Sequence, residues 1–118
     1  MKKMEYDGAK PISKSEVEER LKSSNPEIVS KTLVDLFDHL DDLKWVFKTL
    51  RGHLTHSDTW VAGTAVRLLG EYARSKDSSS VDQVRGALVM VSHREDLSGA
   101  IEDVIEDLDM MATKADRD

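Results

Sequence analysis

Apolar residues recur three and four positions apart along most of the chain, with polar residues between them. This spacing places them on one face of an α-helix, and the pattern restarts several times. Aromatic residues make up only 5% of the chain, and β-branched residues form no alternating runs typical of strands. The sequence therefore predicts an all-α protein. The expected helices cover approximately residues 13–23, 26–39, 43–54, 58–73, 81–92 and 96–111.

Helix-capping residues stand where these helices are expected to begin. Ser13 with Glu16 has capping-box spacing, as does Ser15 with Glu18. Asparagine followed by proline is a strong start signal, because asparagine caps well and proline fits the first helical position. The remaining expected starts are Asn25-Pro26, Asp41-Asp42, Ser57-Asp58, Ser80 at the end of a serine-rich loop, and Asp96.

The helices also resemble one another. A shift of 33 positions superposes the apolar stripe that follows Asn25 on the stripe that follows Asp58. Shifts of 38 and 39 positions superpose Leu43 on Val81, and Val61 on Ala100. Such periodicity is typical of stacked helical hairpins, which share a continuous core.

The run Asp58-x-x-Val61-x-x-x-Ala65-Val66-x-x-Leu69-Gly70 resembles the first helix of a HEAT repeat, particularly the short bacterial type. The resemblance covers about residues 25–111. It implies an α-α superhelix of about two and a half HEAT-like hairpins, with the first helix as an N-terminal cap. One position departs from the usual pattern, since the arginine that often follows the valine is Ala62 here. A plain helical bundle is the alternative.

The 118 residues suffice for one domain. We expect a flexible lead-in over residues 1–12, a single HEAT-like α-helical domain over 13–112 and a frayed tail over 113–118. No signal peptide or membrane span is visible, and cysteine is absent. These features favour a cytoplasmic protein without membrane contact.

A formal net charge of −6 argues against a nucleic-acid partner, which requires a basic face. It favours a basic protein partner or serves solubility alone. His53 and His56 could present two imidazoles to a metal, but no third ligand has a telling spacing. We expect no metal, no cofactor and no enzymatic activity, because no nucleophile–base pair or phosphate loop can be identified.

Trp45 is the most informative single residue. At 100° per residue it falls nearly opposite the apolar stripe of its helix, and an exposed tryptophan among mixed charges is typical of a binding hot spot. Alternatively, Trp45 packs on the N-terminal helix. The HEAT resemblance implies that such second helices line a concave surface. The primary candidate site on this surface comprises Asp41, Trp45, Lys48, Asp82 and Arg85.

An acidic stripe on the last helix is a second candidate binding site, and solvation of the helix is its alternative explanation. It comprises Glu102, Glu106 and Asp109.

These observations favour a protein-binding module that is monomeric when free. The leading hypothesis is a small bacterial immunity protein that neutralises a basic, nuclease-type toxin domain, since complementary charge speeds association. The alternative is an adaptor or assembly subunit that presents a concave HEAT-like surface to a larger complex.

Overall fold

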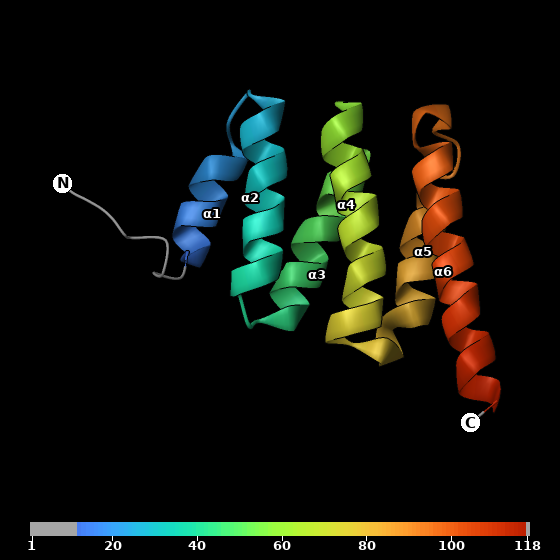
Figure 1. The fold of residues 1–118 in the computed structure, drawn as a ribbon. Helices are drawn as coiled ribbons and strands as arrows, with labels where there is room; N and C mark the ends of the chain where they lie inside the picture. Colours follow the sequence, from blue (N-terminus) through green and yellow to red (C-terminus); the bar gives the residue numbers. More distant parts are fainter. Residues whose placement is uncertain (1–11, 118) are drawn as a thin grey trace.

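Six α-helices joined by short connections form the part of the chain that the computed structural model describes, residues 12–117, with side chains described as far as Met111 (Figure 1). No strand occurs within residues 12–117, so the predicted all-α class is confirmed. The helices are α1 (Lys14–Leu21), α2 (Pro26–His39), α3 (Leu43–Gly52), α4 (Thr59–Glu71), α5 (Val81–Met90) and α6 (Ser98–Arg117). Between them lie the 3₁₀ turns η1 (His53–Thr55), η3 (Ser78–Ser80) and η4 (Glu95–Leu97) and the π turn η2 (Tyr72–Lys76).

The predicted lead-in lies almost entirely outside the described residues, whereas the backbone of the predicted tail is described except for its last residue. Residues 1–11 and 118 lie outside the described residues. The backbone of α6 is helical to Arg117, through most of the segment 113–118 that we expected to fray. The division into lead-in, domain and tail therefore stays a prediction.

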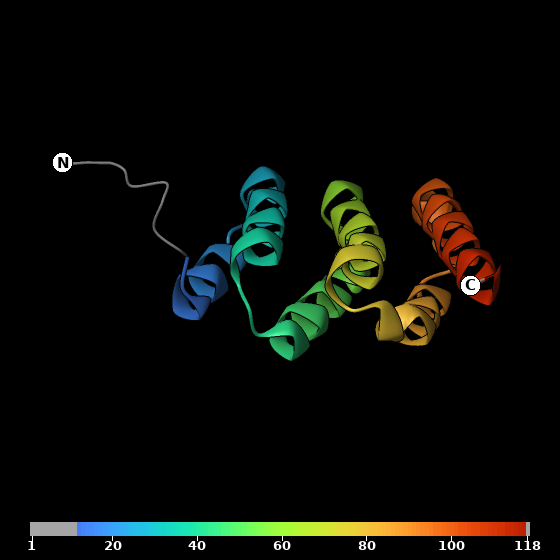
Figure 2. The same ribbon diagram turned by 60° about the horizontal axis from the view of Figure 1, so that its bottom comes forward.

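The helices alternate between two layers. One layer contains α2, α4 and α6, and the other contains α1, α3 and α5 (Figure 2). The molecule measures 53 × 34 × 19 Å, and its smallest dimension corresponds to two helices of about 10 Å each. This is the order expected of stacked hairpins, with α1 at the N-terminal end.

Local capping explains where most helices begin. Ser13 and Glu16 form the predicted capping box at α1, because each side chain accepts a hydrogen bond from the other's backbone N–H. Asn25 accepts from the backbone N–H of Glu27 at the start of α2. The same role at α3 and α4 falls to the carboxylates of Asp42 and Asp58.

Ser80 occupies the N-cap position of α5, as expected, but its side chain does not cap the helix. The hydroxyl instead donates to the carbonyl of Asp77 at 2.7 Å. The carboxylate of Asp77 accepts from the backbone N–H of Ser79 at 3.1 Å. The reason is that Ser78–Ser80 form the 3₁₀ turn η3, which runs directly into α5. The backbone N–H groups without a helical acceptor therefore belong to η3, one turn before α5.

Asp96 also has a different role from the one expected. It lies within η4, and α6 begins two residues later. Its carboxylate accepts a hydrogen bond from the Thr59 hydroxyl at 2.6 Å and pairs with the Arg94 guanidinium at 2.7 Å. Arg94 also donates to the carbonyl oxygens of Leu54 and His56. These bonds tie the connection before α6 to the connection before α4.

The two donors, Arg94 first and Thr59 second, lower the pKa of Asp96 to about 2. A carboxylate with a lowered pKa stabilises the fold in its ionised form, fully so above the unfolded-state pKa of about 4. That contribution is lost as the pH falls through about 2. We therefore expect Asp96→Asn to be less stable than the unsubstituted protein at neutral pH, with a difference that shrinks below pH ~4. Urea unfolding across this pH range tests the prediction, and a constant difference would contradict it.

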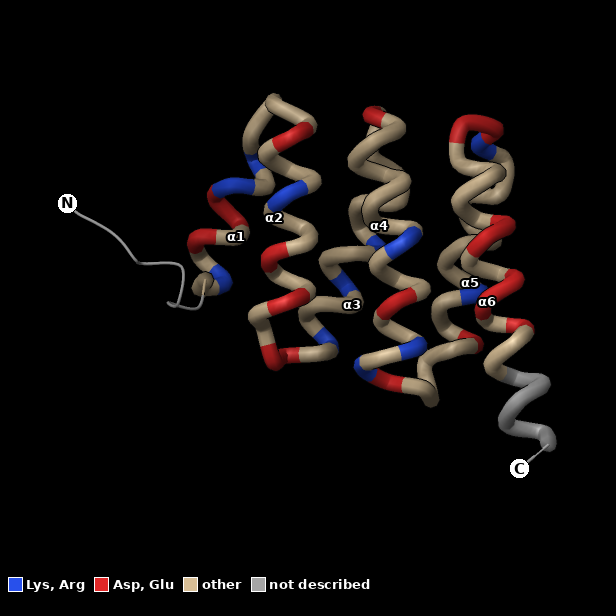
Figure 3. The backbone as a smooth tube through the Cα atoms, viewed as in Figure 1, with Lys and Arg blue, Asp and Glu red and all other residues tan. Residues whose placement is uncertain are grey.

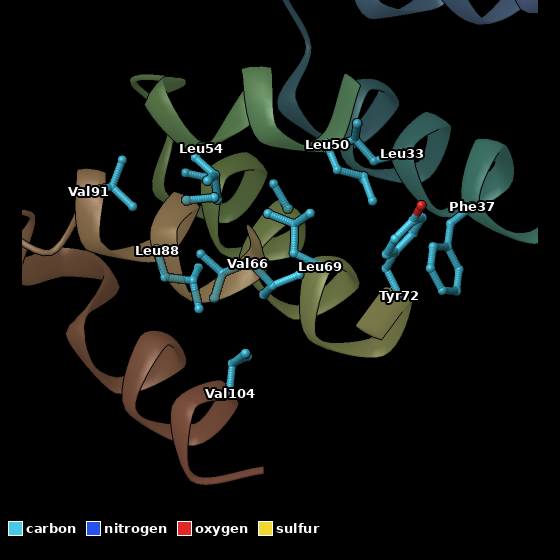
Figure 4. Packing of buried hydrophobic residues seen from close by; sticks show 14 of the residues in the cluster. Leu33, Phe37, Leu50, Leu54, Val66, Leu69, Tyr72, Leu88, Val91 and Val104 are labelled. Carbon is cyan, nitrogen blue, oxygen red and sulfur yellow. The ribbon is translucent and has the colours of Figure 1, made fainter. Parts of the chain in front are cut away.

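The core lies between the two layers (Figure 4). Helix α4 occupies the middle of the molecule and packs against α2 on one side and α6 on the other. Its Val66 and Leu69 are fully buried, as is Leu33 of α2. The predicted inward stripe of α3 is confirmed at Val46 and Leu50. The exposed faces of the helices are therefore free for other roles.

A glycine permits the close packing of α4 against α6. A methyl group at Gly70 would lie 2.9 Å from Cγ1 of Val104, whose branched side chain has little rotational freedom in a helix. We expect Gly70→Ala to lower the free energy of unfolding by about 1–3 kcal/mol through overpacking. In the same helix Gly63 has no such neighbour within 4 Å. Gly63→Ala is therefore the matched control and should stabilise by about 0.5–1 kcal/mol. Equal effects of both substitutions in thermal unfolding would contradict this explanation.

Candidate protein-binding face

The exposed side of the layer formed by α1, α3 and α5 contains a groove between α1 and α3. Its volume is about 660 Å³. Trp45 lines it from α3 and is partly buried against the core, while Leu21 lines it from α1. The remaining lining residues are Glu18, Lys22, Lys48, Thr49, Gly52 and His53. This groove presents a tryptophan and aliphatic carbon beside charged groups, a composition typical of binding sites.

Two environments were predicted for Trp45, an exposed binding surface and a contact with the N-terminal helix, and its position has features of both. The Lys14 ammonium of α1 lies 5.5 Å from the centre of its ring, close enough for a cation–π interaction. An ion pair with Asp42 holds Lys14 in this position. The pKa of the Asp42 carboxyl is lowered, first by the hydrogen bond from Lys14 and next by the hydrogen bond from the backbone N–H of Trp45. Trp45 therefore lies next to the N-terminal helix and also borders an open groove.

A second groove, of about 480 Å³, lies between α3 and α5. Phe47 and Met90 supply its apolar lining, and the Met90 side chain is 68% exposed. Lys48 lines both grooves, because it occupies the ridge of α3 between them. The other lining residues are Arg51, Gln83, Gly86 and Ala87.

Tyr72 holds α3 in place beneath these grooves. Its ring packs at 5.4 Å from the ring of Phe47, and its hydroxyl donates to the carbonyl of Leu43 at 3.2 Å. Burial raises the pKa of Tyr72, so the hydroxyl remains a donor at neutral pH. The start of η2, directly after α4, thus positions the first turn of α3.

The structure divides the predicted primary site. Trp45 and Lys48 share a groove, whereas Asp41 and Asp82 are exposed but line neither groove. Arg85 is partly buried and forms an ion pair with Asp109 of α6. Residues that we assigned to separate primary and secondary sites therefore meet at the boundary between α5 and α6.

The acidic residues of α6 lie on more than one side of that helix. Glu102 and Glu106, from the predicted stripe, are exposed. Asp103 and Asp107 line a smaller groove of about 220 Å³ against α4, where Arg67 is also part of the wall. The acidic character of α6 therefore extends beyond the predicted stripe (Figure 3).

Sequence reasoning missed the basic character of α3. Lys44, Lys48 and Arg51 follow one another at spacings of four and three, which places them on neighbouring turns of one helix side. That spacing was a usable signal, although only Lys48 was predicted as a site residue. Phe47 and Met90 carried no comparable signal, because apolar residues in an amphipathic helix are first assigned to the core.

The histidine pair takes part in local bonding. The rings of His53 and His56 stack at 6.2 Å between centroids. His53 Nδ1 lies 2.8 Å from the carbonyl of Thr49, and His56 Nδ1 accepts from the backbone N–H of Asp58. Among the described residues no group of three or more potential ligands is placed to hold a metal.

Within the part of the chain that the structure describes, no helix is long and apolar enough to cross a membrane.

Fold and surface together define a class: an all-α protein of paired helices with a grooved face of mixed charge. The chain is similar in fold to a chain of the structure titled "Crystal structure of CDI complex from Cupriavidus taiwanensis LMG 19424", with a TM-score of 0.72 and 24% sequence identity. The match covers 92% of this chain and 97% of that chain. No protein family model and no curated protein matches the sequence.

Proposed function

We propose that this protein is an immunity protein that binds and neutralises a cognate toxin domain. The observation that carries the proposal is the fold match to a chain of a CDI complex, since CDI denotes contact-dependent inhibition by toxin–immunity pairs. The match extends over nearly the whole of both chains, so it concerns the complete architecture rather than one hairpin. We also propose that the helical hairpins are HEAT-like repeats.

Surface charge supports the immunity side of such a pair. The net charge of −6 suits a basic, nuclease-type toxin, because opposite charges steer the encounter of two proteins. We assign toxin contacts to Glu102, Glu106 and Asp109 on α6, and to Asp41, Trp45, Lys48, Asp82 and Arg85. Arg85 and Asp109 form an ion pair, which brings one residue of each group together where α5 meets α6. The protein would act as a cytoplasmic monomer by occlusion, without catalysis.

The experiment is a growth test. The partner is captured from native cells with the tagged protein, identified by mass, and expressed alone or together with the immunity protein. We expect the partner to stop growth when alone and to be harmless on co-expression. The affinity of the complex should fall with rising salt. A partner that is harmless alone, or that belongs to a large assembly, would instead indicate an adaptor.

A further inference from the structure

Two of the cations on α3 form no ion pair with another described residue. The helix contains Lys44, Lys48 and Arg51 and no acidic residue. Lys48 and Arg51 take part in none of the ion pairs found between described residues, whereas Arg85 and Arg94 are each paired with an aspartate. Both unpaired cations are exposed and line grooves. Their charge is therefore available to a ligand.

The grooves give these cations a defined apolar setting. Trp45 borders the groove on one side of α3, and Phe47 with Met90 borders the groove on the other side. Lys48 stands between the two grooves. Both groove volumes, about 660 and 480 Å³, fall within the range of about 300–1,000 Å³ that accommodates ligand groups. A segment that crosses α3 can thus place one apolar side chain in each groove while it passes Lys48.

We infer that α3 and its two flanking grooves bind an acidic segment of the toxin that carries bulky apolar side chains. This inference rests on the proposed function and specifies which part of the toxin meets this face. Carboxylates of the segment pair with Lys48 and with the forked guanidinium of Arg51, which suits carboxylate geometry. Apolar side chains beside Trp45 and Phe47 supply most of the affinity, and the charges supply selectivity.

The inference also predicts a charge pattern on the toxin. The acidic side chains of α6 favour a basic surface, while α3 favours an acidic segment. A toxin with both features can bind in only one orientation, because the reversed arrangement places like charges opposite each other.

Short synthetic peptides test the inference directly. The probe alternates aspartate and glutamate with phenylalanine, and two analogues replace its acids by their amides or by lysines. Trp45 fluorescence reports binding in a Trp60→Phe background, since Trp60 is 54% exposed on α4 in the other layer. We expect the acidic peptide to bind at least about tenfold more tightly than the amide analogue, and the lysine analogue to bind least. Equal binding of all three peptides would overturn the inference.

A matched pair of double substitutions localises the site. Lys48→Glu with Arg51→Glu should weaken binding of the acidic peptide by about tenfold or more. Lys31→Glu with Arg67→Glu changes the net charge equally, but at exposed positions on α2 and α4 in the other layer, and should have little effect. Equal weakening by both pairs would show that only net charge matters and would overturn the inference.

The growth test separates this inference from the proposed function. If the unsubstituted protein protects cells and the Lys48→Glu, Arg51→Glu variant protects them equally well, the inference fails and the function stands. If the unsubstituted protein protects no cells from its partner, the proposed function fails, whatever the peptides show. Protection that is lost only in the α3 variant supports both.

Discussion

Replacement of Leu69 by alanine is expected to lower the free energy of unfolding by about 2–5 kcal/mol. Leu69 is fully buried in α4, the helix that packs against both α2 and α6. Truncation removes apolar contacts and leaves a cavity that the surrounding helices cannot fill without moving. A domain of this size has a total stability of roughly 5–15 kcal/mol, so the loss is a large fraction of it.

Urea unfolding followed by far-UV circular dichroism measures this effect. The matched control is Val89→Ala in α5, because the Val89 side chain is 65% exposed. That substitution should change stability by no more than about 0.5 kcal/mol. A loss below about 1 kcal/mol for Leu69→Ala would mean that the layers can collapse around the missing side chain, contrary to the packing described above.

Truncation of Trp45 to alanine should reduce the affinity for the captured partner by about 30-fold or more, which corresponds to about 2 kcal/mol. Trp45 presents the largest apolar side chain on the grooved face, and it lies next to charged groups that orient a ligand. Removal of a central aromatic side chain commonly has the largest effect in an interface. Isothermal titration calorimetry with the purified partner measures the change.

Trp60→Ala is the control for this prediction. Trp60 is the more exposed tryptophan, but it lies on α4, in the other layer, and should change the affinity little. Because Trp45 is also packed partly against the core, the unfolding of each variant must be measured in parallel. Undiminished affinity of a folded Trp45→Ala protein would remove Trp45 from the binding site.

Most helix boundaries could be predicted because their causes are local. Asn25 and Pro26 set the start of α2 through bonds within its own first turn. Ser80 and Asp96, whose side chains bond differently from what we expected, both belong to connections. Asp96 accepts its hydrogen bond from Thr59, which is 37 positions away, and no local pattern reveals such a bond.

Some features of the candidate site could likewise be predicted from local spacing, and others could not. Helical spacing identified the outward position of Trp45, and it could have identified Arg51 as well. The proximity of Lys14 to Trp45 and the pairing of Arg85 with Asp109 depend on how separate helices pack. Spacing along one helix left open whether Trp45 packs on the N-terminal helix, and it could not predict the partner of Arg85.

The sequence by itself determined the all-α class, the order of the helices and the side that each buries. It could do so because capping and amphipathic periodicity act within a few residues. Only the tertiary structure decided which exposed side chains share a surface. It separated α1, α3 and α5 enough to form two grooves, and it placed Lys48 between them. These features follow from distances between helices, which are set by side-chain packing across the core.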